Sequence, residues 1–114
     1  MEKEILKELP ACPVETTMTL ISDKWKVLIL RDLMLGTKRF GELKKSIGHV
    51  TQKVLTAQLR QMEESGLLTR KVYAEVPPRV EYTLTELGYS LKPVLDAMRA
   101  WGERYKNRLE GKAE

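Results

Sequence analysis

The sequence has few of the residues that build catalytic centres and metal sites: among 114 residues it has one cysteine, Cys12, and one histidine, His49. A single cysteine excludes an intrachain disulfide and every metal site that needs paired thiolates. Catalysis by His49 would need a second converging group, and a thiol enzyme based on Cys12 would lack a resolving cysteine. We therefore expect no enzyme activity, no metal and no cofactor.

Long apolar runs are lacking too. No run approaches the ~20 residues that a membrane span needs, and the mixed N-terminus Met1-Glu-Lys-Glu lacks the basic segment and apolar core of a secretory signal. Aromatic residues make up only 6% and charged residues 32%, but apolar positions recur periodically, which disfavours a disordered chain. We expect one folded domain over residues 1–114, located in the cytoplasm and not in a membrane.

Positive charge is concentrated in one part of the chain. The net charge is +4, but residues 38–60 hold six basic side chains against one acidic, a local charge of +5. A local basic cluster is typical of a nucleic-acid binder, although chance clustering on a solvated surface is an alternative that charge alone leaves open. The basic residues of this segment are Lys38, Arg39, Lys44, Lys45, Lys53 and Arg60.

The centre of the chain, residues 51–66, has the pattern of a short amphipathic helix. Leu55, Leu59 and Met62 recur at helical spacing. Thr51 is a suitable N-cap and Gly66 a suitable C-terminal stop. The opposite side carries long polar side chains that can reach into a groove: Gln52, Lys53, Thr56 and Arg60.

The segments around this helix complete a winged helix-turn-helix pattern. We expect helices from Pro13 to Ile21, from a cap at Ser22 or Asp23 to Gly36 with Leu33, Met34 and Leu35 on its apolar face, and from Phe40 to Ile47. Two β-type runs, 69–76 and 80–84, flank Pro77, Pro78 and Arg79 and predict a hairpin. The fold class is mainly α with a small β-hairpin.

A long apolar stripe in the last quarter of the chain predicts a second protein surface. Positions from Leu87 to Leu109 repeat at three- and four-residue steps, as in a heptad seam, and Pro93 predicts a bend. The alternative is that Trp101 and Tyr105 fold back on their own core. We expect this final helix to form a homodimer together with N-terminal residues. The expected interface residues are Ile5, Leu6, Leu95, Met98, Trp101 and Tyr105.

An ordered set of short motifs resembles the HxlR-type transcription regulators, winged-helix relatives of the MarR group. Each motif is weak alone, but the set is specific. The resemblance implies a dimeric bacterial DNA-binding regulator with N- and C-terminal dimerisation helices; repressor activity is a family-level expectation. The motifs are Cys12–Val14, Asp23–Leu30, Arg39–Leu43, Leu55–Arg60, Glu64–Leu68, Val76–Tyr82 and Leu84–Gly88.

On this interpretation the central helix reads bases in the major groove of an inverted repeat. Glutamine suits adenine edges, and arginine or lysine suits guanine. We expect Arg79 at the tip of the wing, where it would enter the minor groove or grip phosphates. The groove-facing residues are Thr51, Gln52, Lys53, Thr56 and Arg60, and the phosphate contacts are Lys38, Lys44 and Lys45. A winged-helix module that binds protein and not DNA is the alternative, disfavoured because Lys53 and Arg60 lie on the outer face.

Cys12 is a candidate sensor. It precedes Pro13 at a helix N-terminus, where the helix dipole favours a thiolate, and the resemblance implies a redox switch as in thiol-sensing members. Glu15 nearby opposes a thiolate, and free cysteines are often buried, so a packing role is the alternative. A redox or small-molecule effector is therefore expected, and its identity is open.

Overall fold

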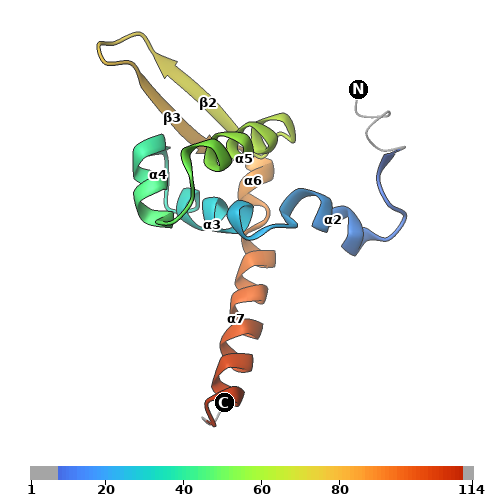
Figure 1. The fold of residues 1–114 in the computed structure, drawn as a ribbon. Helices are drawn as coiled ribbons and strands as arrows, with labels where there is room; N and C mark the ends of the chain where they lie inside the picture. The colour runs from blue at the N-terminus through green and yellow to red at the C-terminus, as the bar shows by residue number, and fades with distance from the viewer. Residues whose placement is uncertain (1–7, 112–114) are drawn as a thin grey trace.

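The computed structural model describes residues 8–111, so the N-terminal interface candidates Ile5 and Leu6 lie outside the described residues. Helices and three short strands alternate along the chain, with one hairpin projecting on one side and a long C-terminal helix on the other (Figure 1). The elements are α2 (Pro13–Ile21), α3 (Lys24–Leu33), β1 (Lys38–Arg39), α4 (Phe40–Ile47), α5 (Gln52–Glu64), β2 (Leu68–Tyr73), β3 (Arg79–Leu84), α6 (Glu86–Tyr89) and α7 (Lys92–Leu109).

Side-chain caps fix where the helices begin. Asp23 accepts a hydrogen bond from the Lys26 backbone N–H at 2.9 Å and so caps α3. Thr51 accepts one from the Val54 N–H at 3.1 Å and caps α5. Gly66 follows α5 with φ +82°, a conformation that glycine adopts without steric cost. The predicted helix starts and the stop of the central helix are confirmed.

The predicted hairpin forms, but it belongs to a three-stranded antiparallel sheet in the order β1-β3-β2. Leu68 lies opposite Leu84, and β2 ends at Tyr73, three residues before the predicted end. The added strand is β1, which pairs Lys38 with Tyr82. A strand of two residues is too short to show any periodicity, so the sequence did not predict it.

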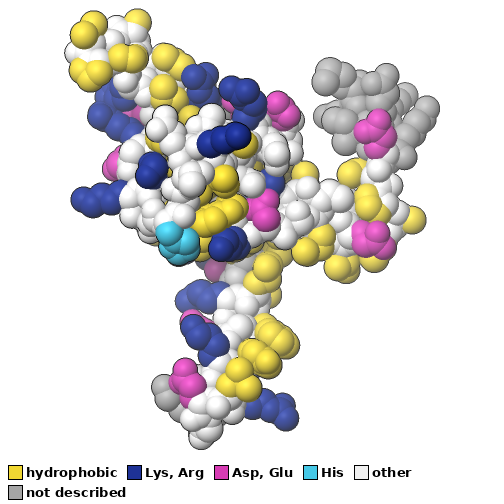
Figure 2. Space-filling view, in the orientation of Figure 1, with side chains coloured by type: hydrophobic (Ala, Val, Ile, Leu, Met, Phe, Trp, Pro, Cys, Tyr) yellow, Lys and Arg dark blue, Asp and Glu magenta, His cyan; other side chains and the backbone are white. Residues whose placement is uncertain are grey.

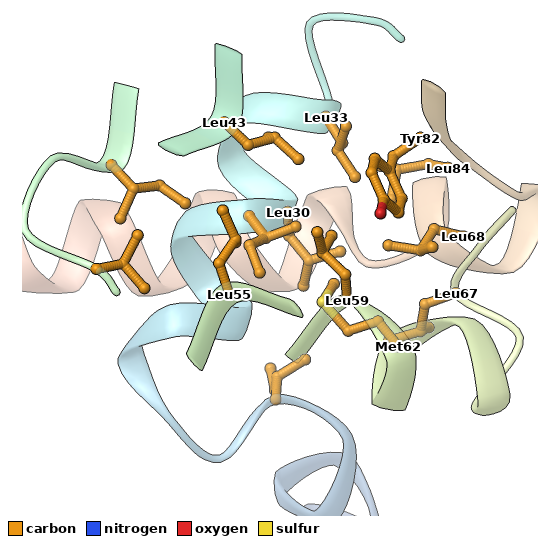
Figure 3. Packing of buried hydrophobic residues seen from close by; sticks show 14 residues of the cluster. Leu30, Leu33, Leu43, Leu55, Leu59, Met62, Leu67, Leu68, Tyr82 and Leu84 are labelled. Carbon is orange, nitrogen blue, oxygen red and sulfur yellow. The ribbon is translucent and has the colours of Figure 1, made fainter. Parts of the chain in front are cut away.

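The hydrophobic core lies where α3, α4, α5 and the sheet meet (Figure 3). Leu30 and Leu33 of α3 are fully buried there, and Leu55 and Leu59 of α5 pack against them. Leu35 was predicted on the apolar face of the second helix, but this was wrong: it is 81% exposed. Because α3 ends at Leu33, Leu35 lies in the turn that follows and not on the buried face.

The C-terminal region contains two helices where one bent helix was predicted. Thr85 caps α6 by accepting a hydrogen bond from the Gly88 N–H at 3.1 Å, and α6 ends at Tyr89. Pro93 lies in the first turn of α7, where its missing N–H costs nothing. The interruption therefore precedes the proline. From there α7 extends away from the core (Figure 1).

Candidate nucleic-acid interface

The outer side of α5 is open to solvent while its inner side is anchored in the core. Leu55, Leu59 and Met62 are buried. The anchored side fixes the helix and leaves the opposite, polar side facing outward, as the periodicity predicted. The predicted groove-facing residues are all exposed: Thr51, Gln52, Lys53, Thr56 and Arg60.

A hollow of about 300 Å³ separates this side of α5 from the sheet. Gln52, Thr56 and Arg60 line its helix wall, and Arg70 of β2 lines its sheet wall. Arg70 was not among the DNA-binding residues predicted from the sequence. The alternation of side chains along a strand could have identified it. Arg70 lies two positions after buried Leu68, so it shares the sheet face that points toward the helices. Two arginines thus flank the hollow from opposite walls.

The predicted phosphate-binding lysines occupy a different part of the surface. Lys38 of β1 and Lys45 of α4 line a second hollow, of about 590 Å³, together with the carboxylate residues Asp32 and Glu42. Lys44 lines neither hollow and is half-buried. Lys38 and Lys45 therefore lie together, away from the hollow beside α5.

Arg79 lies at the start of β3 and not at the tip of the hairpin. Its guanidinium carbon is 3.9 Å from the centre of the Tyr73 ring, a cation–π contact. Its two terminal nitrogens lie 3.1 Å from a Glu75 oxygen and 3.8 Å from a Glu81 oxygen. Fully exposed Val76 precedes two prolines in the loop, and hydrophobic side chains cover the tip at the upper left of Figure 2. The charge of Arg79 is thus engaged within the wing.

Cys12 is the N-cap residue of α2, as its position before Pro13 predicted. Its carbonyl accepts the Thr16 N–H at 3.0 Å, and the residue is exposed. Because Cys12 is exposed, the part of the chain that the structure describes, residues 8–111, does not support a packing role, the alternative to a sensor. The thiol is accessible beside a helix N-terminus.

An apolar stripe runs along α7 on its exposed side. None of the residues of α7 is buried, and Trp101 is 60% exposed. The alternative in which Trp101 and Tyr105 fold back on their own core is therefore wrong. Hydrophobic side chains follow this helix in Figure 2. The exposed apolar residues of α7 are Val94, Met98, Trp101, Tyr105 and Leu109.

The inner end of this stripe opens onto an apolar groove. The groove is about 440 Å³ in volume, and its other wall is formed by Val27 and Leu28 of α3 and by Met34, the residue that follows α3. Leu95 and Met98 contribute the α7 side. The structure describes four of the predicted interface residues, Leu95, Met98, Trp101 and Tyr105, and the first two line this groove. Met98 also belongs to the exposed stripe, so the groove and the stripe form one continuous hydrophobic surface.

The described residues offer neither a metal-binding cluster nor a membrane-spanning helix. Nowhere between residues 8 and 111 do three or more histidine, cysteine, aspartate or glutamate side chains gather in a way that could hold a metal ion. Within that same span, the helices are too short or too polar to cross a membrane.

A capped helix pair, α4 and α5, followed by an antiparallel hairpin defines a winged helix-turn-helix protein. Residues 20–110 match the family of HxlR-like helix-turn-helix proteins, and the chain belongs to that family. It is therefore a DNA-binding transcription regulator, and the predicted family and fold class are confirmed.

The proteins similar to this chain are transcription regulators, and one of them is a redox regulator. The uncharacterised HTH-type transcriptional regulator YdeP of Bacillus subtilis is 48% identical over 103 residues, 90% of this chain and 80% of that protein. The redox regulator HypR in its reduced form has a TM-score of 0.82 at 43% identity, covering 88% of this chain and 99% of that chain. The reduced form of the transcriptional regulator YodB from B. subtilis has a TM-score of 0.73 at 37% identity, covering 84% and 95%.

Proposed function

We propose that this protein is a homodimeric repressor that recognises an inverted repeat by inserting α5 into the major groove. One observation carries the proposal: the polar side of α5 is exposed while Leu55, Leu59 and Met62 hold its other side in the core. A helix presented in this way fits the width of the major groove of B-DNA. Two copies related by a two-fold axis would place their α5 helices on two half-sites.

Base recognition falls to side chains from the outer side of α5. Gln52 suits the N6 and N7 edge of adenine, and Lys53 or Arg60 suits O6 and N7 of guanine. Thr51 and Thr56 have hydroxyls that can contact either a base edge or a phosphate. Because all five side chains are exposed, they can reach DNA without a rearrangement of the core.

Phosphate contacts set the register of the protein on the duplex. Lys38, Lys44 and Lys45 supply cations on the β1 and α4 side. Arg70 adds a fourth cation beside the hollow between α5 and the sheet. Arg79 reaches DNA from the wing only if it leaves Glu75, whose carboxylate lies 3.1 Å away. Arg79 is therefore a DNA contact that competes with a contact inside the wing.

Homodimerisation accounts for the exposed apolar side of α7. The radius of gyration is 16.2 Å, whereas a compact domain of about 100 residues has about 13 Å. Part of the excess comes from α7, which extends away from the core (Figure 1). A second copy that packs on Leu95, Met98, Trp101 and Tyr105 would bury this side, with the N-terminal Ile5 and Leu6 completing the interface.

Cys12 is proposed as the oxidant-responsive residue. Its exposed thiol lies at the N-terminus of α2, and the chain is similar to the redox regulator HypR. A peroxide would convert the thiolate to a sulfenic acid with loss of water or alcohol, and a second thiol would then form a disulfide and release water. That second thiol comes from a small molecule or from Cys12 of the other subunit, because the chain has one cysteine.

The proposal includes the organisation and location of the protein. Residues 1–114 act as one unit, in the cytoplasm, without enzyme activity of their own. The match to a family of transcription regulators over residues 20–110 supports this proposal. A small molecule remains a candidate effector beside an oxidant.

A binding selection from random duplexes, made with the purified protein under reducing conditions, tests the proposal. The expected product is an inverted repeat with half-sites about one helical turn or a multiple apart. Enrichment of no duplex would contradict sequence-specific binding and would favour the protein-interaction module. The selection is then repeated after mild oxidation, and the expected result is a loss or change of enrichment.

A further inference from the structure

A buried lysine connects the start of α3 to the side of α5. Lys26 is only 7% exposed, which is unusual for a lysine because a buried charge is costly unless it is paired. Its ammonium donates hydrogen bonds to the Asp23 carboxylate at 3.0 Å, to Gln58 Oε1 at 2.7 Å and to Gln61 Oε1 at 2.8 Å. An ammonium has three N–H donors, so this cluster uses each of them once.

The two glutamines come from α5, three residues apart on one side of the helix. At about 100° per residue, Gln58 and Gln61 lie on one flank of the buried stripe that contains Leu59, and Gln52 and Thr56 lie on the other. Apolar contacts along a stripe resist separation of two helices, but they are not directional and tolerate some rotation. Two hydrogen bonds from a fixed ammonium are directional and restrain that rotation.

Asp23 anchors the lysine from the α3 side. One carboxylate oxygen caps the helix through the Lys26 N–H and the other accepts from the Lys26 ammonium. Burial acts to raise the pKa of Asp23, but the hydrogen bonds from Lys26, its positive charge and a contribution from Gln58 hold that pKa below its usual value. The carboxylate is therefore ionised at neutral pH and keeps the ammonium in place.

From this geometry we infer that Lys26 is a positioning residue for DNA recognition, which fixes the rotation of α5 about its axis through Gln58 and Gln61. The inference rests on the proposed function of α5. It assigns a role in DNA recognition to a residue that does not itself contact DNA. The Lys26 ammonium is enclosed by its three oxygen partners, so it is not available to a phosphate. Its effect on DNA binding must therefore pass through α5.

The test compares Lys26→Met with wild type on two duplexes, the site enriched by selection and a scrambled version, at one salt concentration. The variant should fold, because methionine has an unbranched side chain of similar length and the Asp23 cap of α3 remains. Gln58 is half-buried and Gln61 exposed, so both amides can turn to form hydrogen bonds with water. Far-UV circular dichroism checks this. The matched control is Lys24→Met, which removes the same charge from an exposed position on the same helix.

The expected result is that Lys26→Met lowers the ratio of affinities for the two duplexes by about tenfold, the size of one lost base contact. Its affinity for the scrambled duplex and its salt dependence should match those of Lys24→Met. The double variant Gln58→Met/Gln61→Met should lower the affinity ratio by a similar factor. Adding Lys26→Met to the double variant should lower that ratio little further, because the three residues act as one unit. If Lys26→Met does not fold, this double variant alone decides the question.

Three results overturn the inference. A folded Lys26→Met protein that discriminates as well as wild type removes the positioning role and leaves the proposed function intact. An equal loss on both duplexes, or the same loss in Lys24→Met, identifies a general effect of charge or stability. A wild-type protein that prefers no duplex overturns the proposed function and this inference with it.

Discussion

Trp101 and Tyr105 stack on each other one turn apart on the exposed side of α7, with 5.4 Å between their ring centroids and 12° between their planes. The pair forms a flat apolar surface that residues 8–111 leave half exposed or more. Aromatic residues in such positions are frequent anchors of protein interfaces.

Removal of this anchor should weaken the dimer. Trp101→Ala is expected to cost about 2 kcal/mol or more of association free energy, and DNA affinity should fall with it because one half-site contact alone is weak. Sedimentation equilibrium measures the dimer constant. Glu103→Ala is the control, since Glu103 is exposed and forms a weak surface ion pair with Arg99 at 3.8 Å. An unchanged dimer for Trp101→Ala would place the interface elsewhere.

Gly88 marks a close approach between α6 and the segment before β2. A Cβ atom at Gly88 would collide with the Leu67 carbonyl oxygen and touch Leu84. Because the neighbour is backbone, it cannot move aside cheaply, and Gly88→Ala should lower the free energy of unfolding by about 1–3 kcal/mol or more. Urea denaturation measures this. Gly41→Ala, where a Cβ meets nothing within 4 Å, should leave stability equal or slightly higher. Equal urea midpoints for Gly88→Ala and Gly41→Ala would show that Gly88 does not lie close to the Leu67 backbone.

The depressed pKa of Asp23 makes stability depend on pH in a defined direction. A carboxyl group with a lower pKa in the folded state stabilises the protein above its unfolded pKa of about 4, and this contribution is lost as pH falls through the folded value. Asp23→Asn keeps a cap for α3 but cannot ionise. Wild type should therefore exceed Asp23→Asn in urea midpoint at pH 7, with the difference shrinking below about pH 4. A difference that stays constant down to pH 3 would contradict the assigned pKa direction.

Local patterns in the sequence were sufficient for most of the fold. The caps at Asp23 and Thr51, the stop at Gly66 and the core stripe through Leu59 depend on neighbours within a few residues, so they could be predicted. Features that depend on distant partners could not. Strand β1 exists because Lys38 pairs with Tyr82, which lies far along the chain.

In the candidate site, too, the features set by near neighbours could be predicted and those set by distant partners could not. The exposure of Lys53 and Arg60 on α5 follows from helical periodicity. The engagement of Arg79 by Tyr73 and by two glutamates depends on the register of the hairpin, which the turn sequence did not reveal. The burial of Lys26 depends on Gln58, 32 residues away, and no sequence pattern distinguishes it from an exposed lysine.

Oxidation should change DNA binding through Cys12. Mild oxidant is expected to alter the affinity of wild type for its selected site several-fold and to leave Cys12→Ser unchanged, because serine cannot form a disulfide. Anisotropy titrations before and after oxidant, and again after a reducing thiol, measure this effect and its reversal. Non-reducing electrophoresis distinguishes a bridge between subunits from a mixed disulfide. The sensor role fails if Cys12→Ser responds as wild type does, or if a thiol reagent leaves native Cys12 unlabelled.

Two lysine variants distinguish base recognition by α5 from phosphate contact by α4. Lys53 lies on the outer side of α5 and Lys44 in the last turn of α4, so they differ in the expected partner, a base edge or a phosphate. Lys53→Ala should cost about 1–3 kcal/mol on the selected site and relax its specificity, whereas Lys44→Ala should weaken all duplexes alike and reduce the salt slope by about one.

Binding selections on wild type, Lys53→Ala and Lys44→Ala, run in parallel and read by sequencing, test the central claim most directly. If α5 reads bases in two symmetric half-sites, Lys53→Ala loses its preference at one base position in each half-site, and Lys44→Ala enriches the wild-type motif more weakly. An unaltered motif in Lys53→Ala, or a preference lost in Lys44→Ala instead, would contradict recognition by the outer side of α5.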